Sequence, residues 1–437
     1  MEEAVTQKTS VCWLRRDLRL FDNTALFHAL KSGFPVLVVF IFDTEILKKL
    51  PQKKDKRVAF IHEQLKKINK QLQEKGSSLL VFNTTPKKAF LELLSEYKVQ
   101  EIFTNEDYEP YAISRDREIK EMAEKKGVEF HSFKDQVIFA KNEVLKPDDS
   151  PYTVFTPYSK KWKERFYGED LPGFPSEEHL DKLVKLPKKT VPSLTEIGFE
   201  NVDLEVPPAN VSEGLLKNYE KTRDLPSLNG TSRLGVHLRF GTVSIRQMVM
   251  KAADFSETFL NELIWREFFM MILFHFPYVE HNNFRRKYDR LQWRNNEQEF
   301  ELWCRGETGF PMVDAGMRQL NETGWMHNRV RMITAGFLTK HLLIDWRWGE
   351  AYFAEKLLDY ELASNNGNWQ WAAGTGCDSA PYFRIFNPDT QLKKFDPDLK
   401  YVKTWIKDFE PGYLEPIVEH KFARERALET YKKALNK

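Results

Sequence analysis

The sequence predicts an α/β domain with a doubly wound parallel sheet, followed by an all-helical domain. Five short apolar runs alternate with helical patterns near the start of the chain, which is typical of a parallel sheet. Prolines then gather between Pro147 and Pro208, and from Ser212 onward the apolar residues recur with a helical period. We therefore expect an α/β domain at 1–140, an interdomain linker at 141–210 and a helical domain at 211–437.

The five apolar runs of the first domain are expected to be buried strands. They are Ser10–Leu14, Pro35–Phe42, Ser78–Phe82, Val99–Thr104 and Val128–Phe133. Helices are expected between and after them, at Asn23–Ser32, Val58–Leu72, Phe90–Tyr97 and Arg115–Lys126.

The turn after the first strand reads Arg15-Arg16-Asp17-Leu18-Arg19. It lacks a glycine-rich fingerprint, so the sequence does not predict an NAD-type site there. Two interpretations of this turn stay open. Either a small ligand binds at the carboxyl ends of the strands, or the turn joins the two domains through ion pairs.

Composition restricts the class of protein. The chain is 41% hydrophobic and 30% charged, as in soluble globular proteins, and its net charge of +2 means that nucleic-acid binding would need a local basic patch. Cys12, Cys304 and Cys377 lie far apart without metal-ligand spacing, which favours a reducing compartment. With no apolar run of about 18 residues and a polar N-terminus, we expect a cytoplasmic protein.

Two patterns in the second half have both a functional and an ordinary structural interpretation. The turn Gly230–Gly235 (GTSRLG) offers backbone N–H groups and hydroxyls that suit a phosphate, although an ordinary helix cap is more common. The helix predicted at Glu257–His275 places Glu262, Trp265 and Arg266 on one face. That face suits a cavity for an aromatic ligand, or it is an amphipathic surface with a Glu/Arg pair.

A further helix is predicted from Trp325 to about Leu343. On it Arg329 and Arg331 point to different faces, so one can meet a phosphate and the other an internal acid such as Asp359. His327 has no partner at ligand spacing, so we expect no metal.

The stretch Asp359–Pro388 combines amides, tryptophans and glycines. It indicates either a flat ligand held close to backbone or a large core with a glycine-rich turn.

Six segments in this order resemble the photolyase/cryptochrome family, most closely the class I cyclobutane pyrimidine dimer photolyases. They are GTSRL, NELIWREFF, TGWMHNRVRM, LLIDWRWGE, ASNNGNWQWAAGTG and PYFRIFNP. The resemblance covers nearly the whole chain, because RRDLR followed by Asp22-Asn23 is similar to the family's N-terminal opening. It implies an N-terminal antenna domain and a helical domain that binds FAD, whose photoexcited reduced form donates an electron to a flipped-out dimer.

The resemblance also implies roles for individual residues. Those implied to bind FAD are Tyr219, Thr231, Ser232, Arg233, Leu234, Gly235, Glu262, Arg266, Asn328, Arg331, Asp359, Tyr360, Glu361 and Asn365. Those implied to contact the dimer or DNA are Glu262, Trp265, Arg266, Asn328, Arg329, Met332, Trp371 and Arg384. Electron transfer to the flavin is implied for Trp369, Trp346 and Trp293, each of which taken singly would otherwise be expected to be a core residue.

Three departures from the family pattern limit these implications. Glu361 stands where Asp is usual, and Gly235 replaces a frequent Ser. The segment Tyr108–Ala112 does not carry the Asn-Glu pair expected for folate. The second chromophore is therefore left open between a deazaflavin, a folate, another flavin and none.

Repair of cyclobutane dimers by a monomer is the function that we expect. The alternatives are a cryptochrome-type photoreceptor, a (6-4) photoproduct photolyase and a single-strand-binding protein without enzymatic activity. Asn365, the Trp265/Trp371 pair and the absence of a long C-terminal tail favour repair over signalling. A single-strand binder would leave the α/β domain and the GTSRL turn unexplained.

Overall fold

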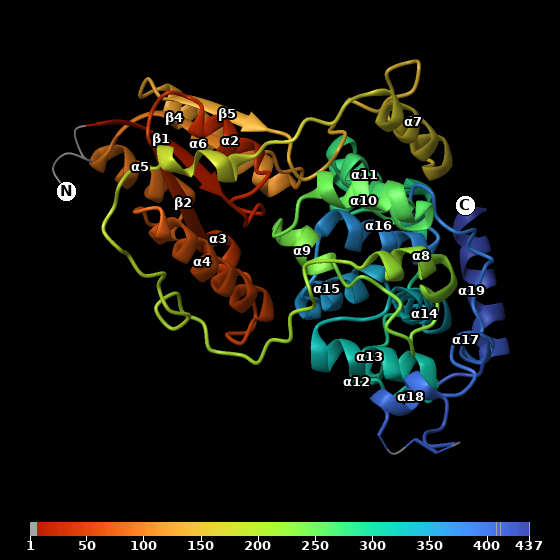
Figure 1. Ribbon diagram of the computed structural model, residues 1–437. Coiled ribbons are helices and arrows are strands. Elements are labelled where there is room, and N and C mark those ends of the chain that lie inside the picture. Colours follow the sequence, from red (N-terminus) through yellow and green to blue (C-terminus); the bar gives the residue numbers. More distant parts are fainter. Residues whose placement is uncertain (1–6, 408, 411, 437) are drawn as a thin grey trace. The chain divides into compact units, whose positions relative to one another are not determined.

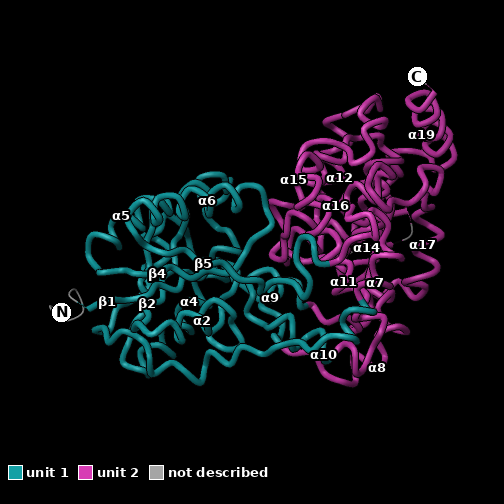
Figure 2. Tube along the Cα trace, turned by 90° about the horizontal axis from the view of Figure 1, so that it is seen from above, with its two compact units in different colours: residues 1–143, 163–209, 234–251 teal, residues 144–162, 210–233, 252–437 magenta. Residues whose placement is uncertain are grey.

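The computed structural model describes residues 7–407, 409–410 and 412–436, so the polar N-terminal residues 1–6 lie outside the described part. The chain forms two compact units, coloured separately in Figure 2. An α/β unit comprises 1–143, 163–209 and 234–251, and a helical unit comprises 144–162, 210–233 and 252–437. The expected linker is thus divided between both units, and it contains helix α7 (Phe155–Gly168) and 3₁₀ helix η1 (Ser176–Lys182).

The α/β unit is built on a five-stranded parallel sheet in the order β3-β2-β1-β4-β5, which confirms the predicted fold class (Figure 1). The strands are β1 (Lys8–Leu14), β2 (Val36–Asp43), β3 (Leu80–Thr84), β4 (Lys98–Asn105) and β5 (Glu129–Phe133). β1 and β2 are almost wholly buried, as their continuous apolar runs predict. Because β1 pairs with both β2 and β4, the strand order reverses between β1 and β4, where such sheets form a ligand-binding crevice.

Short helices connect the strands of this unit. They are α2 (Thr24–Leu30), α3 (Thr44–Leu47), α4 (Lys56–Glu74), α5 (Pro86–Glu96) and α6 (Pro110–Glu124), with α9 (Gly235–Phe240) and most of α10 (Ile245–Phe255) from later in the chain. The predicted cap Asn23 is confirmed, since its side chain accepts the Leu26 N–H at 3.1 Å. The predicted start of α6 at Arg115 is wrong: the helix begins at Pro110, whose fixed φ suits a first helical position.

A buried ionic cluster fixes the segment 234–251 to the rest of the α/β unit. Arg19 lies 2.7 Å from Asp135, and Arg246 lies 3.0 Å from both Asp22 and Asp135. Asp135 is 1% exposed and Asp22 6%, so neither carboxylate can be left without a cation at low cost. A segment more than 100 residues downstream of the sheet is therefore an integral part of the α/β unit.

The helical unit contains no strand among the residues that the structure describes, as its helical periodicity predicts. Its helices are α8 (Glu213–Thr222), α11 (Glu257–His275), η2 (Pro277–Glu280), η3 (Arg286–Arg290), α12 (Glu297–Arg305), α13 (Pro311–Thr323), α14 (Asn328–Gly336), the π-helical turn η4 (Phe337–His341), α15 (Trp346–Lys356), α16 (Leu362–Ala373), α17 (Pro388–Phe395), α18 (Lys400–Trp405) and α19 (His420–Leu435).

Of the bounds predicted for two of these helices, one set is confirmed and the other is wrong. Helix α11 has the bounds expected from the sequence. The start predicted at Trp325 is wrong, because His327 caps α14 by accepting the Arg329 N–H, so the helix begins at Asn328.

Close packing of α11 against α16 depends on Gly367. A Cβ at this position would clash with the ring of Phe269, so only glycine lets the two helices approach as they do. α11 carries Glu262 and Trp265, whereas α16 carries Asn365 and Trp371. The contact therefore brings together the two helices on which most of the predicted catalytic residues lie.

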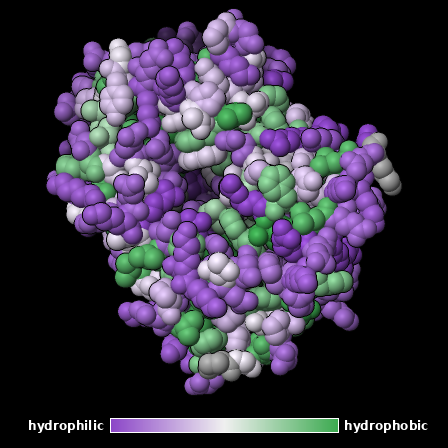
Figure 3. Space-filling model, turned by 90° about the vertical axis from the view of Figure 1, so that its right-hand side faces the viewer, coloured by the Kyte–Doolittle hydropathy of each residue, from purple (hydrophilic) through white to green (hydrophobic). Residues whose placement is uncertain are grey.

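No helix in the described ranges is long and apolar enough to cross a bilayer. The face drawn in Figure 3 is mostly hydrophilic, with hydrophobic residues scattered between charged ones. Cys12, Cys304 and Cys377 are unpaired, as their spacing predicts.

Candidate functional site

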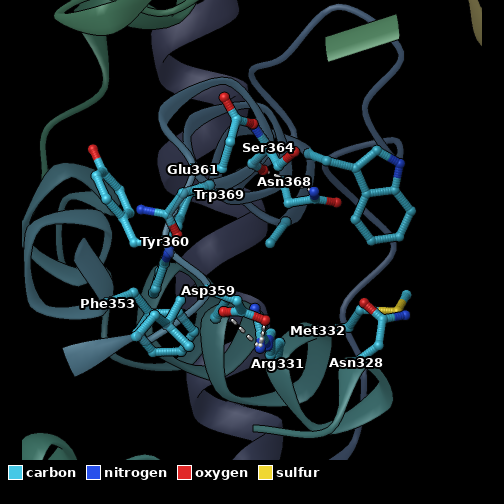
Figure 4. Close-up of a pocket in the computed structure, with 15 residues that line it drawn as sticks. Asn328, Arg331, Met332, Phe353, Asp359, Tyr360, Glu361, Ser364, Asn368 and Trp369 are labelled. Carbon is cyan, nitrogen blue, oxygen red and sulfur yellow. Dashed lines mark hydrogen bonds and ion pairs between the residues drawn. The ribbon is translucent and has the colours of Figure 1, made fainter. Parts of the chain in front are cut away.

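A pocket in the helical unit gathers many of the residues that the motifs predict (Figure 4). Side chains of α14 lie on one side of it and side chains from the start of α16 on the other. Of the predicted residues, those that line the pocket are Asn328, Arg331, Met332, Asp359, Tyr360, Glu361, Asn365, Trp369 and Trp371. The pocket thus offers amides, carboxylates, a guanidinium and aromatic faces, a set that suits a flat ligand with hydrogen-bonding edges.

An ion pair closes one side of this pocket. Arg331 lies 2.9 Å from Asp359, so of the two arginines on α14 it is Arg331 that meets the internal acid expected from the sequence. The Arg331 guanidinium also donates to the Met326 carbonyl at 2.8 Å, so its orientation is fixed from two directions. Its counterpart Arg329 points elsewhere, where it pairs with Asp224 at 2.8 Å and lies over the ring of Phe395.

Asn365 is held by a carboxylic acid that the sequence analysis did not identify. Its amide donates to the Glu350 side chain at 2.8 Å and to the Glu350 backbone carbonyl at 3.1 Å. Burial raises the pKa of Glu350 to about 7, against the opposing effect of the hydrogen bond from Asn365. Glu350 is not among the residues that line the pocket, but it places an acid with a raised pKa directly behind Asn365, which does line it.

Glu361 has a structural role that accounts for one departure from the family pattern. It caps α16, and its carboxylate accepts the backbone N–H groups of Ala363 and Ser364 at 3.3 and 2.8 Å. The additional methylene relative to Asp is thus accommodated by the cap. Asn366 and Gln370 face away from the pocket and donate to the Val279 carbonyl at 2.9 and 3.0 Å.

The tryptophans predicted to transfer electrons lie in one aromatic core. Trp369 lines the pocket and is 2% exposed, and Trp346 belongs to the same buried cluster, with its indole N–H donating to Asn283 at 2.9 Å. Trp293 is half-buried and packs at the edge of that cluster. One of the three indoles thus lies at the pocket wall and another at a partly exposed position of the same cluster, as an electron path to the surface would require.

The predicted face of α11 lies outside the set of residues that line the pocket. Glu262 and Trp265 are both partly exposed there. Glu262 forms an ion pair with Arg223 at 2.5 Å. Burial lowers the pKa of Arg223, but the Glu262 carboxylate outweighs it and raises the pKa overall. The sequence contained no signal for this pair, because 39 residues separate its members.

The turn Thr231–Gly235 is not part of this pocket. Arg233 has a positive φ of 51° and its guanidinium lies 4.4 Å from the centre of the Trp325 ring. Tyr219 is buried and packs edge-on against Phe259. Arg384 is exposed, in the loop that follows α16. FAD or DNA contacts by these residues stay predictions, as they do for Arg266.

Comparison with known proteins identifies the family of this chain. A family model described as the FAD binding domain of DNA photolyase matches residues 259–411, and one described as DNA photolyase matches 10–177. Deoxyribodipyrimidine photo-lyases from Alkalihalophilus pseudofirmus and Escherichia coli are 37% and 36% identical to the chain, over 96% and 98% of its length and 97% and 99% of theirs. The chain belongs to the photolyase/cryptochrome family.

Solved structures of this family show the same fold. A class III photolyase from Agrobacterium tumefaciens superposes with a TM-score of 0.85 at 32% identity, covering 99% of this chain and 98% of that one. A photolyase from Sulfolobus tokodaii that holds two FAD molecules gives 0.79 at 35% identity, covering 97% and 100%. A cryptochrome from Synechocystis gives 0.82 at 25% identity, covering 97% and 99%. The expected FAD-binding photo-lyase architecture is confirmed, whereas the assignment to class I stays a prediction.

A second cavity lies in the α/β unit, at the carboxyl ends of β1, β2 and β4. It is lined by apolar and aromatic residues together with charged ones: Trp13, Arg15, Arg16, Phe40, Ile41, Phe42, Asp43, Ile46, Leu47, Ile61, Asp107, Glu109, Tyr111, Ala112, Arg115, Arg239 and Phe240. This is the place where the sequence analysis located a ligand for the Arg15–Arg19 turn, as one of two interpretations.

The charged residues of this cavity pair within the α/β unit. Arg16 lies 3.1 Å from Asp107 and 2.9 Å from Glu109. Burial alone would raise the pKa of Asp107, but Arg16 and the neighbouring arginines outweigh burial and hold that pKa well below its usual range. Tyr111 donates to Asp43 at 2.6 Å. The segment Tyr108–Ala112, which lacks the expected folate pair, therefore contributes to a preorganised wall instead.

Proposed function

We propose that the protein repairs cyclobutane pyrimidine dimers in DNA under blue light. The observation that carries this proposal is the gathering of Asn328, Met332, Asn365 and Trp371 around one pocket beside the Arg331–Asp359 pair. The relatives named photo-lyases, which align over nearly their whole length, support it.

The pocket fits the flavin part of FAD. Its aromatic walls suit a fused ring, and its amide and carboxylate groups suit the polar edge of that ring. When bound, FAD would supply the photoexcited electron that splits the dimer. The chain's contribution is to orient the ring through Asn365 and Arg331 and to exclude water with Trp369 and Phe353.

Residues of α11 and α16 would receive the flipped-out lesion. Trp265 and Trp371 offer flat apolar faces against which an extruded base can stack, at a lower cost for a lesion that already stacks poorly. Glu262 can accept a hydrogen bond from a pyrimidine edge, and its ion pair with Arg223 fixes the direction of that carboxylate. Arg329 and Arg384 would contact phosphates, so that binding weakens with salt.

Two features favour dimer repair over the alternatives within the family. Asn365 is an amide, whereas the plant cryptochromes carry Asp at this place. His327 is 1% exposed and serves as a helix cap, and burial lowers its pKa to about 4. It is therefore not placed to act as the lesion-pocket acid that a (6-4) photolyase requires. A photoreceptor function remains the second candidate, given the similarity to the Synechocystis cryptochrome.

We also propose that the strand-end cavity of the α/β unit binds a second, light-harvesting chromophore. Its aromatic side chains and arginines suit a flat ligand that carries negative charge. The Sulfolobus tokodaii relative with two FAD molecules is described as implying a novel light-harvesting cofactor. A flavin or deazaflavin fits this cavity better than a folate, given the Tyr108–Ala112 sequence.

Photorepair of UV-irradiated oligothymidylate by the reduced protein tests the main proposal. Recovery of thymine absorbance under blue light, and none in the dark, is expected. Trp265→Ala and Glu262→Ala should each reduce the recovery, whereas Trp371→Phe should keep part of it because a ring remains. Absence of recovery by a protein with FAD bound would refute dimer repair and leave the photoreceptor as the better candidate.

A further inference from the structure

Phe155 lies flat against the tryptophan that is proposed to stack on the lesion. The ring centres of Phe155 and Trp265 are 3.7 Å apart and their planes differ by only 5°. Phe155 comes from the segment expected to be a linker, but residues 144–162 belong to the helical unit. A residue more than 100 positions upstream of α11 thus covers part of the Trp265 indole.

The position of Phe155 is fixed by its own surroundings. Its backbone N–H donates to the Asp378 carboxylate at 3.0 Å. Its ring also meets Phe268 edge-on, at 5.9 Å between centres, and Phe268 is 0% exposed. Phe155 therefore extends the hydrophobic core outward to Trp265, and it is not a loose side chain resting on the surface.

A buried carboxylate of α11 holds the turns that follow Phe155. Glu267, which is 3% exposed, accepts the Trp162 indole N–H at 2.5 Å and lies 3.5 Å from the Tyr158 hydroxyl. Glu267 is two residues from Trp265 on the same helix. The 155–162 segment and α11 are thus joined by polar contacts to Glu267 as well as by the stacked rings.

From this arrangement we infer that Phe155 is a positioning residue for Trp265, fixing the plane of the indole on which the flipped base stacks. The inference rests on the proposed repair function. Phe268 and Phe269 also contact this partly exposed indole, but at 84° and 31° to its plane, so Phe155 is the ring that lies parallel to it. Without Phe155 the indole would have more rotational freedom, which stacking on a base would have to restrict at the moment of binding. A parallel ring in contact with the indole restricts those rotamers beforehand, so Phe155 contributes to affinity for the lesion and not to the chemical step.

The opposite role would make Phe155 a plug that occupies the place of the base until DNA displaces it. The contacts to Asp378 and Phe268 favour support over displacement, because both would have to break for the ring to leave. The two roles predict opposite changes in affinity when the ring is removed.

The test compares the FAD-loaded full-length protein with Phe155→Ala, Phe155→Leu and Phe155→Tyr. The neighbouring substitution Val154→Ala is the matched control, since Val154 is 44% exposed. Fluorescence anisotropy gives the Kd for an oligothymidylate with one cyclobutane dimer and for the same undamaged oligonucleotide. FAD content and the repair rate at saturating DNA are measured in parallel.

We expect Phe155→Ala and Phe155→Leu to weaken binding of the damaged strand roughly three- to tenfold, as the loss of an aromatic pair implies. Binding of the undamaged strand, FAD content and the saturated repair rate should not change, and Phe155→Tyr should bind as the native protein does. The leucine variant, which keeps apolar volume without a flat ring, decides the question if the alanine variant loses FAD.

Unchanged affinity of Phe155→Leu for the damaged strand would overturn the inference, and tighter binding would establish the plug instead. A native protein that binds both strands equally, with no effect of Trp265→Ala, would show that the repair proposal itself has failed.

Discussion

The two cavities of this protein are built in different ways. The helical-unit pocket is lined by residues from 328 to 372, a single stretch of chain in which α14 and α16 face one another. The strand-end cavity is lined by residues from 13 to 240, which meet only because β1, β2 and β4 end side by side. A local motif can therefore identify the lining of the first, whereas the lining residues of the second come together only in the folded sheet.

Their polar groups also differ. The helical-unit pocket combines one ion pair with amides, and the acid Glu350, whose burial raises its pKa to about 7, lies behind Asn365. In the strand-end cavity, arginines and carboxylates pair with each other around aromatic rings. This difference agrees with the proposal that the first site binds the FAD that takes part in repair, whereas the second binds a light-harvesting chromophore.

The sharpest test of this comparison removes one arginine from each cavity. Arg331→Ala should weaken FAD binding roughly 10- to 100-fold, because it leaves the Asp359 carboxylate without its partner. Arg115→Ala should reduce only the second chromophore, since the guanidinium of Arg115 lies over Trp13 at 4.9 Å in the other cavity. Chromophores released by denaturation and separated by chromatography give both contents.

Two results would contradict this comparison of the two cavities. Loss of both chromophores in either variant, with the same melting temperature as the native protein, would mean that the cavities are not independent. If the native protein releases only FAD, and only one equivalent of it, the proposal that the strand-end cavity binds a second chromophore is wrong.

A second, smaller effect is expected at the contact between α11 and α16. Gly367→Ala should lower the free energy of unfolding by roughly 1–3 kcal/mol, because the new methyl group displaces the Phe269 ring. Gly214→Ala in α8 is the matched control: a Cβ there meets nothing within 4 Å, so helix propensity alone should make it neutral or slightly stabilising. Equal denaturation midpoints for the two variants would show that the close contact does not support the pocket.

A third effect depends on pH and concerns Glu350, which lies behind Asn365. Its folded-state pKa of about 7 exceeds the ordinary value of 4.5, so the folded protein binds the proton more tightly than the unfolded chain does. Stability should therefore fall as pH rises from 4.5 to 7, and Glu350→Gln should lack this component. The variant should be more stable than the native protein by roughly 3 kcal/mol at pH 8 and about equal to it near pH 4.5.

Chemical denaturation of the FAD-loaded proteins at several pH values measures this difference, with Glu355→Gln on the same helix as control. A difference that stays constant from pH 4.5 to 8 would contradict the raised pKa.

Much of the fold was predictable because the patterns behind it are local. The buried strands are continuous apolar runs, and α11 follows a helical period between a serine cap and an aromatic end. The predicted starts of α6 and α14 were wrong, because a single residue decides each of these boundaries. These residues are Pro110 at the first position of α6 and His327 at the cap of α14.

In the site, the residues alone predicted that one of Arg329 and Arg331 meets an internal acid such as Asp359, and the family resemblance implied that this arginine is Arg331. Three other residues could not be found that way. Glu350 gains its high pKa from burial, Arg223 meets Glu262 only through packing of α8 on α11, and Phe155 reaches Trp265 from the expected linker. Each depends on tertiary neighbours for which the local pattern contains no signal.

The ionic cluster of Asp22, Asp135 and Arg246 bears on how this protein can be divided. A fragment ending near residue 210 would include both acids but lack Arg246 and the rest of the 234–251 segment. It would keep Arg19 as a cation for Asp135 and leave Asp22 without the guanidinium that pairs with it in the intact protein. The α/β unit is therefore not a transplantable module: an exchange of this unit between relatives would have to include the distant 234–251 segment.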